Sequence, residues 1–225
     1  MIGCKLLQRF FDVVFSVVAL VILCPVLLVV SVILRFTGER EVFFYQDRVG
    51  MFRRNIIVIK FATMLKNSPN IGTRSITLID DPRVLPLGNF LRKTKINELL
   101  QLINVIRGDM SLIGPRPLTY ENFSMYTPDM QELLSSVRPG LSGVASIVFR
   151  DEQKFLSDVS TAGSIYKSVI APYKSDLEYW YVKNNSITLY FKLIICTVHA
   201  VLYPKSNLLS KLCPNIPKPP SELNF

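Results

Sequence analysis

The longest apolar stretch of the chain lies near its N-terminus, where no charged residue occurs from Val13 to Leu34. A helix rises about 1.5 Å per residue, so these roughly 22 positions extend about 33 Å, enough to cross a bilayer. Pro25 lies in the middle of the stretch, where it removes a backbone hydrogen bond and kinks a helix. The pattern alone therefore leaves two alternatives open, a single membrane span and a re-entrant helix that breaks at Pro25.

Between Glu41 and Met64 the pattern changes to that of paired strands. Val42–Tyr45 is rich in β-forming residues, Gly50 lies in the turn region, and Ile56–Ile59 is a β-branched run. Two such runs around a turn predict a β-hairpin. Residues 67–86, which follow, are polar and rich in turn formers, and they predict a loop.

The next segment has the spacing of an amphipathic helix. Thr94 or Asn97 is a candidate cap at its start, and Gly108 stands where a helix ends. On this interpretation Glu98 lies in the first turn, where unpaired N–H groups and the helix field favour anions. Such a place is suited to a phosphate and a carboxylate-bound metal ion. The apolar stripe of this helix is formed by Ile96, Leu99, Leu100, Ile103 and Ile106.

The same segment continues into Gly114–Pro117, in which two prolines flank Arg116. The prolines fix the backbone on either side of this arginine. A rigidly held guanidinium suits bidentate phosphate binding. The alternative is an ordinary amphipathic helix followed by a proline turn, which the local pattern does not exclude.

The second half of the chain predicts several helices. Thr127 and Pro128 form a helix start, as cap and first helical residue, and Pro172 opens another helix. Residues 186–202 form the last long apolar segment, with Lys192 as its only formal charge. We expect an interfacial helix in the membrane plane here, with a buried core helix as the alternative. From Pro204 onward the proline-rich tail is expected to be extended or mobile.

Composition and charge narrow the choice of partners. The 225 residues are 49% hydrophobic, the mean hydropathy is +0.32 and the net charge is +9. An apolar and basic chain favours an anionic membrane surface. The basic residues are scattered without a recognition motif, which argues against nucleic acid. The four cysteines show no C-x-x-C spacing and there is one histidine, which argues against a zinc site and a disulfide scaffold.

The segment Lys93–Pro117 resembles the signature of the bacterial sugar transferases, the small monotopic phosphoglycosyl transferases. Val42–Gly50, Lys60–Met64 and Ser136–Gly143 also resemble segments of this family, so the similarity extends over nearly the whole chain. Cys24–Pro25 lies at the family's membrane break, with cysteine in place of the usual serine. The resemblance therefore implies a re-entrant helix that dips into one leaflet, with its basic flanks on the cytoplasmic side.

The resemblance implies an α/β fold, mostly helical with a small β-hairpin, in a monotopic membrane protein with an N-terminal re-entrant helix-break-helix and interfacial amphipathic helices. Residues 1–38 are expected to form the membrane-embedded part, residues 39–203 the cytoplasmic catalytic domain with interfacial helices, and residues 204–225 the tail. The implied activity moves a sugar phosphate from a UDP-sugar to polyprenyl (undecaprenyl) phosphate and releases UMP, the first membrane step of bacterial glycoconjugate assembly. The implied location is the cytoplasmic face of the bacterial inner membrane, in contact with membrane lipids, and a homodimer is a candidate assembly.

The resemblance also assigns candidate site residues. Asn97 stands where the family has its nucleophilic aspartate. Glu98, beside it, is the candidate ligand of Mg²⁺, a hard cation suited to an oxygen site that keeps waters. The candidate substrate-binding residues are Lys60, Arg92, Arg116, Arg138, Arg150 and Glu178, of which Glu178 replaces a family aspartate.

Asn97 is the departure from the family that matters most. An asparagine amide cannot attack phosphorus efficiently, because its nitrogen lone pair is delocalised and its oxygen carries no full charge. Three explanations are open: a natural variant that uses Glu98 or another carboxylate, a site altered to trap substrate, and an inactive relative that acts as a membrane scaffold in glycan assembly. Two further departures are Ala62 in place of a family arginine and the loss of polar residues just before Arg150.

Overall fold

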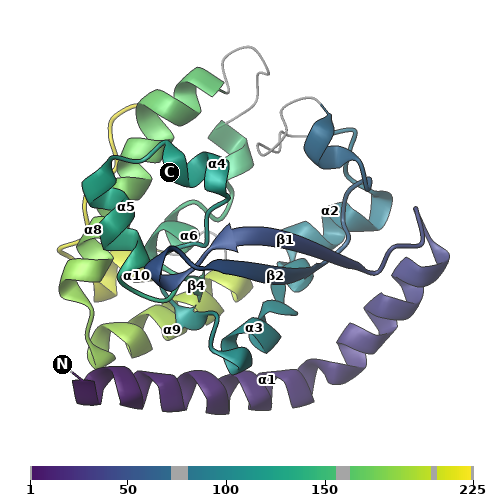
Figure 1. Ribbon diagram of the computed structural model, residues 1–225, viewed down its shortest axis with the longest axis horizontal. Coiled ribbons are helices and arrows are strands. Elements are labelled where there is room, and N and C mark those ends of the chain that lie inside the picture. Colours follow the sequence, from purple (N-terminus) through teal and green to yellow (C-terminus); the bar gives the residue numbers. More distant parts are fainter. Residues whose placement is uncertain (1, 72–80, 156–162, 204–206, 224–225) are drawn as a thin grey trace.

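The computed structural model describes residues 2–71, 81–155, 163–203 and 207–223. Its longest element is helix α1, Ile2–Phe36, which contains Pro25. The helix is not interrupted at Cys24–Pro25, where the sequence analysis expects a break. It continues through Pro25 and bends along its second half (Figure 1). A single missing N–H kinks an α-helix without necessarily ending it.

The predicted hairpin is confirmed. Strands β1, Phe43–Val49, and β2, Asn55–Phe61, pair antiparallel, and their paired ends bring Phe43 opposite Phe61. The turn between them contains a 3₁₀ helix, η1, Met51–Arg53, in which Phe52 has a left-handed backbone with a φ of 58°. Side chains alternate along β1, so that Arg48 lies on the more buried face.

The sequence does not predict the second strand pair. Strand β3, Ser111–Ile113, pairs in parallel with β4, Gly140–Ser142, and each has only three residues, too few for a periodic signal. Gly140 is required at this contact, because a Cβ there would lie 2.1 Å from the backbone nitrogen of Gly114. The pair fixes the Gly114–Pro117 segment, which follows β3, against the chain that follows Arg138.

Among the described residues, four short helices lie between the hairpin and β3. They are η2, Ser68–Asn70, α2, Pro86–Lys93, the 3₁₀ helix η3, Ile96–Glu98, and α3, Gln101–Arg107. Residues 72–80 of the predicted loop lie outside the described part of the chain. Gly108 ends α3 with a left-handed φ of 94°, as the sequence predicts.

Helices form the rest of the body. The start predicted at Thr127 and Pro128 is confirmed, since the Thr127 hydroxyl accepts a hydrogen bond from the N–H of Met130. The π-helix η5 precedes α8, which has Pro172 in its first turn. The bounds are α4 Tyr120–Ser124, α5 Pro128–Ser135, α6 Val144–Val148, η4 Glu152–Phe155, η5 Tyr166–Ile170, α8 Ala171–Asn184, α9 Ile187–Leu202 and α10 Leu208–Leu212.

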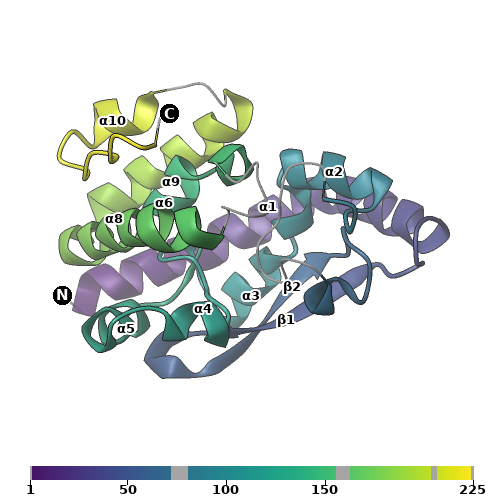
Figure 2. The same ribbon diagram turned by 90° about the horizontal axis from the view of Figure 1, so that it is seen from above.

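The C-terminal segment is more ordered than the sequence predicts. Residues 207–223 include α10 and bury Cys213 and Leu223 in the main core, where the Tyr173 hydroxyl donates to the carbonyl of Pro217 at 2.9 Å. The expectation of an extended tail is therefore wrong for α10. The rest of the segment is neither helix nor strand, and it packs on the core because apolar side chains between the prolines find partners there. Helix α10 and the β1–β2 hairpin lie on opposite sides of the molecule (Figure 2).

One face of α1 rests on the same globular body in both halves of the helix. Its N-terminal half contacts α3, where Arg9 donates to two backbone carbonyls. Its C-terminal half packs on a cluster that includes residues of β2 and α2. The buried stripe of α1 comprises Asp12, Ser16, Leu27, Val30 and Leu34.

The opposite face of α1 is apolar and exposed. Among the described residues, α1 is the one helix that is long and apolar enough, by length and composition, to cross a membrane. Helix α9 also has two faces, since it buries Tyr190 and Leu193 and exposes Ile195 and Val198. Exposed apolar surface of this extent is typical of membrane association. On α1 it includes Leu6, Phe10, Val21, Ile22, Leu28, Val29 and Val32.

Candidate active site

The backbone before α3 differs from the predicted helix start. Thr94 ends α2, with its hydroxyl donating to the carbonyl of Phe90 at 2.8 Å, and Lys95 follows with a left-handed φ of 61°. The residue before α3 is Leu100, which makes no side-chain cap. The predicted cap by Thr94 or Asn97 is therefore wrong. The left-handed Lys95 separates α2 from a 3₁₀ turn that carries Asn97 and Glu98, and α3 begins only at Gln101, after this turn.

Glu98 is the centre of a partly buried group of charges. Its carboxylate Oε1 lies 2.8 Å from Nη2 of Arg116 and 3.5 Å from Nζ of Lys60, and its side chain is 15% exposed. Burial alone would raise the pKa of Glu98, but the positive charges of Arg116 and Lys60 bring it well below its ordinary value. Glu98 is therefore ionised at neutral pH.

Lys60 lies beside this carboxylate, where the sequence analysis expects it. Burial lowers the pKa of Lys60 to about 7, the negative charge of Glu98 opposes that change, and Arg48 and Arg116 reinforce it. Burial also lowers the pKa of Arg92, which is near enough for its charge to interact with Glu98. Basic groups thus outnumber the single carboxylate.

Two further residues, Arg48 and Lys95, belong to this group of charges but are not among the candidate site residues of the sequence analysis. Burial and, to a smaller extent, the charge of Arg116 lower the pKa of Arg48 to about 10. The Arg48 guanidinium donates to the carbonyl of Pro117 at 2.9 Å. Lys95 donates to the carbonyl of Arg150 at 3.2 Å, and burial lowers its pKa while Glu98 opposes this. The alternation of side chains along β1 could have predicted that Arg48 faces inward. No comparable sequence pattern predicts the position of Lys95.

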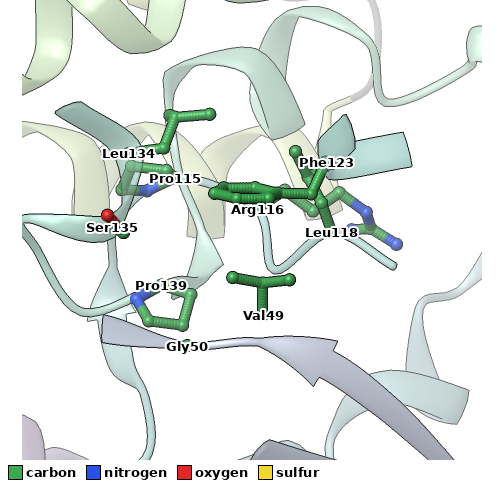
Figure 3. A pocket seen from close by; sticks show the side chains of 9 residues that line it. All are labelled: Val49, Gly50, Pro115, Arg116, Leu118, Phe123, Leu134, Ser135 and Pro139. Carbon is green, nitrogen blue, oxygen red and sulfur yellow. The ribbon is translucent and has the colours of Figure 1, made fainter. Parts of the chain in front are cut away.

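Arg116 is held from both sides. Its guanidinium reaches Glu98, and its backbone N–H donates to Oε1 of Glu178 at 3.3 Å. Glu98 raises the pKa of the Arg116 side chain, which keeps the guanidinium charged. In Figure 3 the guanidinium points away from Leu134 and Ser135, which line a small apolar pocket on the other side of the residue.

Glu178 is buried but is not paired with a side-chain cation at close range in the way that Glu98 is. Burial raises the pKa of Glu178 to about 8, although the N–H of Arg116 and the charge of Lys174 act to lower it. Its second oxygen, Oε2, is buried without a hydrogen-bond partner among the described residues. Glu178 is therefore protonated at neutral pH and holds the backbone of Arg116.

Asn97 is also buried, with 7% of its surface exposed. Its amide oxygen, Oδ1, has no hydrogen-bond partner in the described part of the chain. A buried acceptor without a partner is uncommon and costs free energy. Position 97 therefore presents a polar group whose hydrogen bonding the protein itself does not complete.

Two predicted phosphate-binding arginines point elsewhere. The Nε of Arg138 donates to the carbonyl of Gly108 at 3.1 Å, at the far end of α3 from Glu98. The guanidinium of Arg150 donates to the carbonyls of Ala200 and Lys93. The structure thus brings Lys60, Arg92 and Arg116 to Glu98, and it leaves Arg138 and Arg150 bound to backbone carbonyls.

Comparison with known proteins decides the family. The chain matches the family described as bacterial sugar transferase over residues 4–204. It belongs to this family. It is 32% identical to the exopolysaccharide production protein ExoY of Sinorhizobium fredii, covering 68% of this chain and 74% of ExoY. It is 32% identical to the uncharacterized sugar transferase EpsL of Bacillus subtilis, covering 88% of each chain.

The name of a third relative includes a substrate. The chain is 30% identical to the undecaprenyl-phosphate galactose phosphotransferase of Salmonella typhimurium over 206 residues, which are 84% of this chain and 40% of that enzyme. The sugar transferases that resemble it therefore include both proteins of similar length and longer ones of which it spans less than half.

The donor atoms near Glu98 suit a hard cation. No group of three or more histidine, cysteine, aspartate or glutamate side chains that would hold a metal ion occurs among the residues that the structure describes. One carboxylate beside a carbonyl oxygen without a partner is an oxygen-only set, which Mg²⁺ accepts when substrate phosphates and waters supply its other ligands. Glu98 supplies the carboxylate, and Oδ1 of Asn97, the preceding residue on the same 3₁₀ turn, is a carbonyl oxygen without a partner among the described residues.

Proposed function

We propose that the protein transfers a sugar phosphate from a UDP-sugar to undecaprenyl phosphate, at the start of bacterial polysaccharide or glycoconjugate assembly. The observation that carries the proposal is the ionised Glu98 between Arg116 and Lys60, in a group where basic side chains are in excess. Two substrates that are dense in negative charge need such a surplus. The exposed apolar face of α1 suits the lipid acceptor.

The proposed step is an in-line displacement at the β-phosphorus of the UDP-sugar. A phosphate oxygen of the lipid attacks this phosphorus, the bond to the α-phosphate oxygen breaks, and the electron pair leaves on UMP. Arg116 binds the diphosphate through its planar fork, and Lys60 and Arg92 balance the charge on the equatorial oxygens. Asn97 orients a phosphate or water oxygen through its amide and does not form a covalent intermediate.

A magnesium ion completes the proposed site. Glu98 would hold it together with the amide oxygen of Asn97, and the ion would neutralise the diphosphate and polarise phosphorus. A Glu98 carboxylate engaged by the ion would leave the Arg116 guanidinium free to bind the phosphate. Lys60 stays beside both groups because its side chain is buried.

The second candidate function is a membrane scaffold without turnover. The observation in its favour is Asn97, which replaces the family's nucleophile with a buried amide. The distribution of basic residues around Glu98 favours catalysis over this alternative, because an inert scaffold has no need of a desolvated charge group. A folded, membrane-bound protein that fails to release UMP from every UDP-sugar would support the scaffold.

We also propose that the protein is monotopic and lies on the cytoplasmic face of the inner membrane, with α1 re-entrant. Both halves of α1 contact the same globular body, which is difficult to reconcile with ends on opposite sides of a bilayer. Single cysteines at Gly3 and Arg40, in a background without the native cysteines, should both resist a membrane-impermeant thiol reagent added outside intact cells. Labelling of the N-terminal position alone would establish a true span.

UMP release tests the transferase proposal directly. The full chain in lipid nanodiscs should release UMP from at least one of UDP-glucose, UDP-galactose and UDP-N-acetylgalactosamine, only when undecaprenyl phosphate and Mg²⁺ are present. Release that does not need the lipid would indicate a hydrolase. The homodimer stays a prediction, which the mass of the nanodisc-embedded protein tests.

A further inference from the structure

A second pocket, which is lined by polar and charged residues, lies at the N-terminal end of α1, with about 430 Å³ of empty space including its open mouth. We propose that it binds the phosphate group of an anionic membrane glycerophospholipid. This inference goes beyond the proposed transfer reaction and does not depend on it. The residues that line the pocket and carry the inference are Lys5, Arg9, Met51, Arg138 and Asn185.

Positive charge dominates the pocket. Arg9 donates to the carbonyls of Val105 and Ile106, and Arg138 uses its Nε for the carbonyl of Gly108. These bonds fix both guanidiniums at the C-terminal end of α3 and leave the terminal nitrogens of Arg138 for a ligand. Lys5 is exposed and makes no hydrogen bond or ion pair within the described residues. Lysine and arginine together are the usual ligands of a phosphate diester.

The one acid in the pocket does not cancel this charge. Oδ1 of Asp12 accepts hydrogen bonds from the hydroxyls of Ser111 and Tyr190 and from the N–H of Leu112. Burial raises the pKa of Asp12, although these hydrogen bonds and Arg9 act to lower it. The Asp12 carboxylate thus joins α1 to β3 through hydrogen bonds from neutral donors.

Asn185 supplies a polar group without a partner. It ends α8 and lines the pocket, and its Oδ1 is buried with no hydrogen-bond partner among the described residues. A buried acceptor of this kind is satisfied by a hydroxyl donor. The glycerol hydroxyls of phosphatidylglycerol are such donors, next to a phosphate that faces the cations.

The surroundings of the pocket favour a lipid over a free phosphate ion. On α1, Leu6 is 67% exposed and Phe10 is 60% exposed, next to the residues that line the pocket. The hairpin turn that contributes Met51 also exposes Phe52 at 65%, and two arginines follow it. Exposed aromatic and basic residues side by side are typical of the membrane–water interface. Acyl chains can therefore follow α1 while the headgroup enters the pocket.

This pocket and the Glu98 site lie at opposite ends of one segment. Glu98 precedes α3 and Gly108 ends it, so about 15 Å of helical rise separates the two. The proposed lipid therefore does not occupy the site of phosphate transfer.

Native mass spectrometry of the full chain released from nanodiscs tests the inference. In a mixture of phosphatidylcholine and phosphatidylglycerol, the protein should retain one phosphatidylglycerol in preference. Asn185→Asp is isosteric and brings a negative charge to the phosphate, so it should reduce this retention about fivefold. Asn184→Asp makes the same change on the neighbouring exposed residue and should leave retention unchanged.

Lys5→Gln is the second test, because it leaves the fold unaltered. It should also lower retention several-fold, whereas Lys218→Gln, at an exposed position of the C-terminal segment, should not. Equal retention in Asn185→Asp and Asn184→Asp would overturn the inference. So would occupancy by inorganic phosphate alone, or displacement of the phospholipid by one equivalent of undecaprenyl phosphate. Glu98→Gln should retain the phospholipid while losing transfer, which separates this inference from the proposed function.

Discussion

Arg116 stands between two buried carboxyl groups that behave in opposite ways. Glu98 forms ion pairs with the side chains of Arg116 and Lys60, and the pKa of Glu98 is well below its ordinary value. Glu178 accepts a hydrogen bond from the backbone N–H of Arg116, and burial raises the pKa of Glu178 to about 8. Both are glutamates with little exposed surface, so the difference in pKa comes from which donors face them.

The comparison separates two tasks. Glu98 is charged and keeps three or more cations close together without a substrate. Glu178 is neutral, so it holds the Arg116 backbone without cancelling the positive charge that the phosphates need. A charged Glu178 would compete with the substrate for Arg116. The protonation state of each carboxyl group is therefore as important to the proposed reaction as its position.

The largest effect is expected when the charged member of the pair is neutralised. Glu98→Gln removes the proposed magnesium ligand and the counter-charge of Arg116 and Lys60, and it should lower kcat by at least about a hundredfold. UMP release in nanodiscs measures this. Glu132→Gln, the same change at an exposed position, is the control. A Glu98→Gln protein with normal turnover would remove Glu98 from the site.

Arg116→Lys keeps the charge between the two carboxyl groups and removes the planar fork. We expect kcat/KM for the UDP-sugar to fall about tenfold or more, because a lysine binds a phosphate at one point. Arg107→Lys, on the exposed end of α3, is the matched control. Unchanged kinetics would mean that Arg116 serves only to hold Glu98.

Asn97→Asp places a carboxyl group next to Glu98 in the chain. The excess of basic side chains around the adjacent Glu98 favours ionisation of this aspartate, whose carboxylate is the nucleophile that the amide lacks. Turnover should rise by about tenfold, and mass spectrometry should detect a phosphosugar adduct on residue 97. A protein that turns over fast with Asn97 and is slowed by this substitution uses a different route, and the assigned role of position 97 would be wrong.

The pH dependence of kcat/KM should reflect Lys60. Its pKa of about 7 means that the side chain is charged below pH 7 and becomes neutral above it. If the charge binds phosphate, kcat/KM falls as pH rises through about 7. Lys60→Arg stays charged and should flatten this decline. A profile that is flat between pH 6 and 8 in the unmodified protein would exclude Lys60 as a phosphate ligand.

The smallest effect on activity is expected from Glu178→Gln, which mimics the protonated acid. Because the folded state keeps the proton up to pH of about 8 and the unfolded state loses it near pH 4.5, Glu178 makes the protein less stable as pH rises through this range. The substitution should remove that decline, so that its Tm exceeds that of the unmodified protein more at pH 8 than at pH 5. A constant difference would show that Glu178 is already ionised.

The sequence predicts well where a signal is local and periodic. The hairpin follows from its β-branched runs, the start of α5 from Thr127 and Pro128, and the end of α3 from Gly108. Glu98, Lys60 and Arg116 are far apart in the chain, so no local pattern predicts that they meet. The resemblance to the family's motifs is what makes all three of them candidate site residues.

The sequence predicts poorly where backbone geometry or long-range contacts decide. Lys95 adopts a left-handed conformation although it is neither glycine nor asparagine, so the sequence does not predict the separate 3₁₀ turn that carries Asn97 and Glu98 before α3. The parallel β3–β4 pair depends on contacts between residues about thirty positions apart. The orientation of Arg138 and Arg150 depends on which carbonyl lies nearby, and no spacing of residues contains that information.

The most direct test of the central claim is to count both products of one reaction. The full chain in nanodiscs, given undecaprenyl phosphate, Mg²⁺ and the UDP-sugar that it accepts, should form UMP and undecaprenyl diphosphate sugar in equal amounts, and Glu98→Gln should form neither. Equal amounts would mean that the sugar phosphate passes to the lipid. UMP without the lipid product, or the lipid product at an unchanged rate in Glu98→Gln, would contradict transfer at this site.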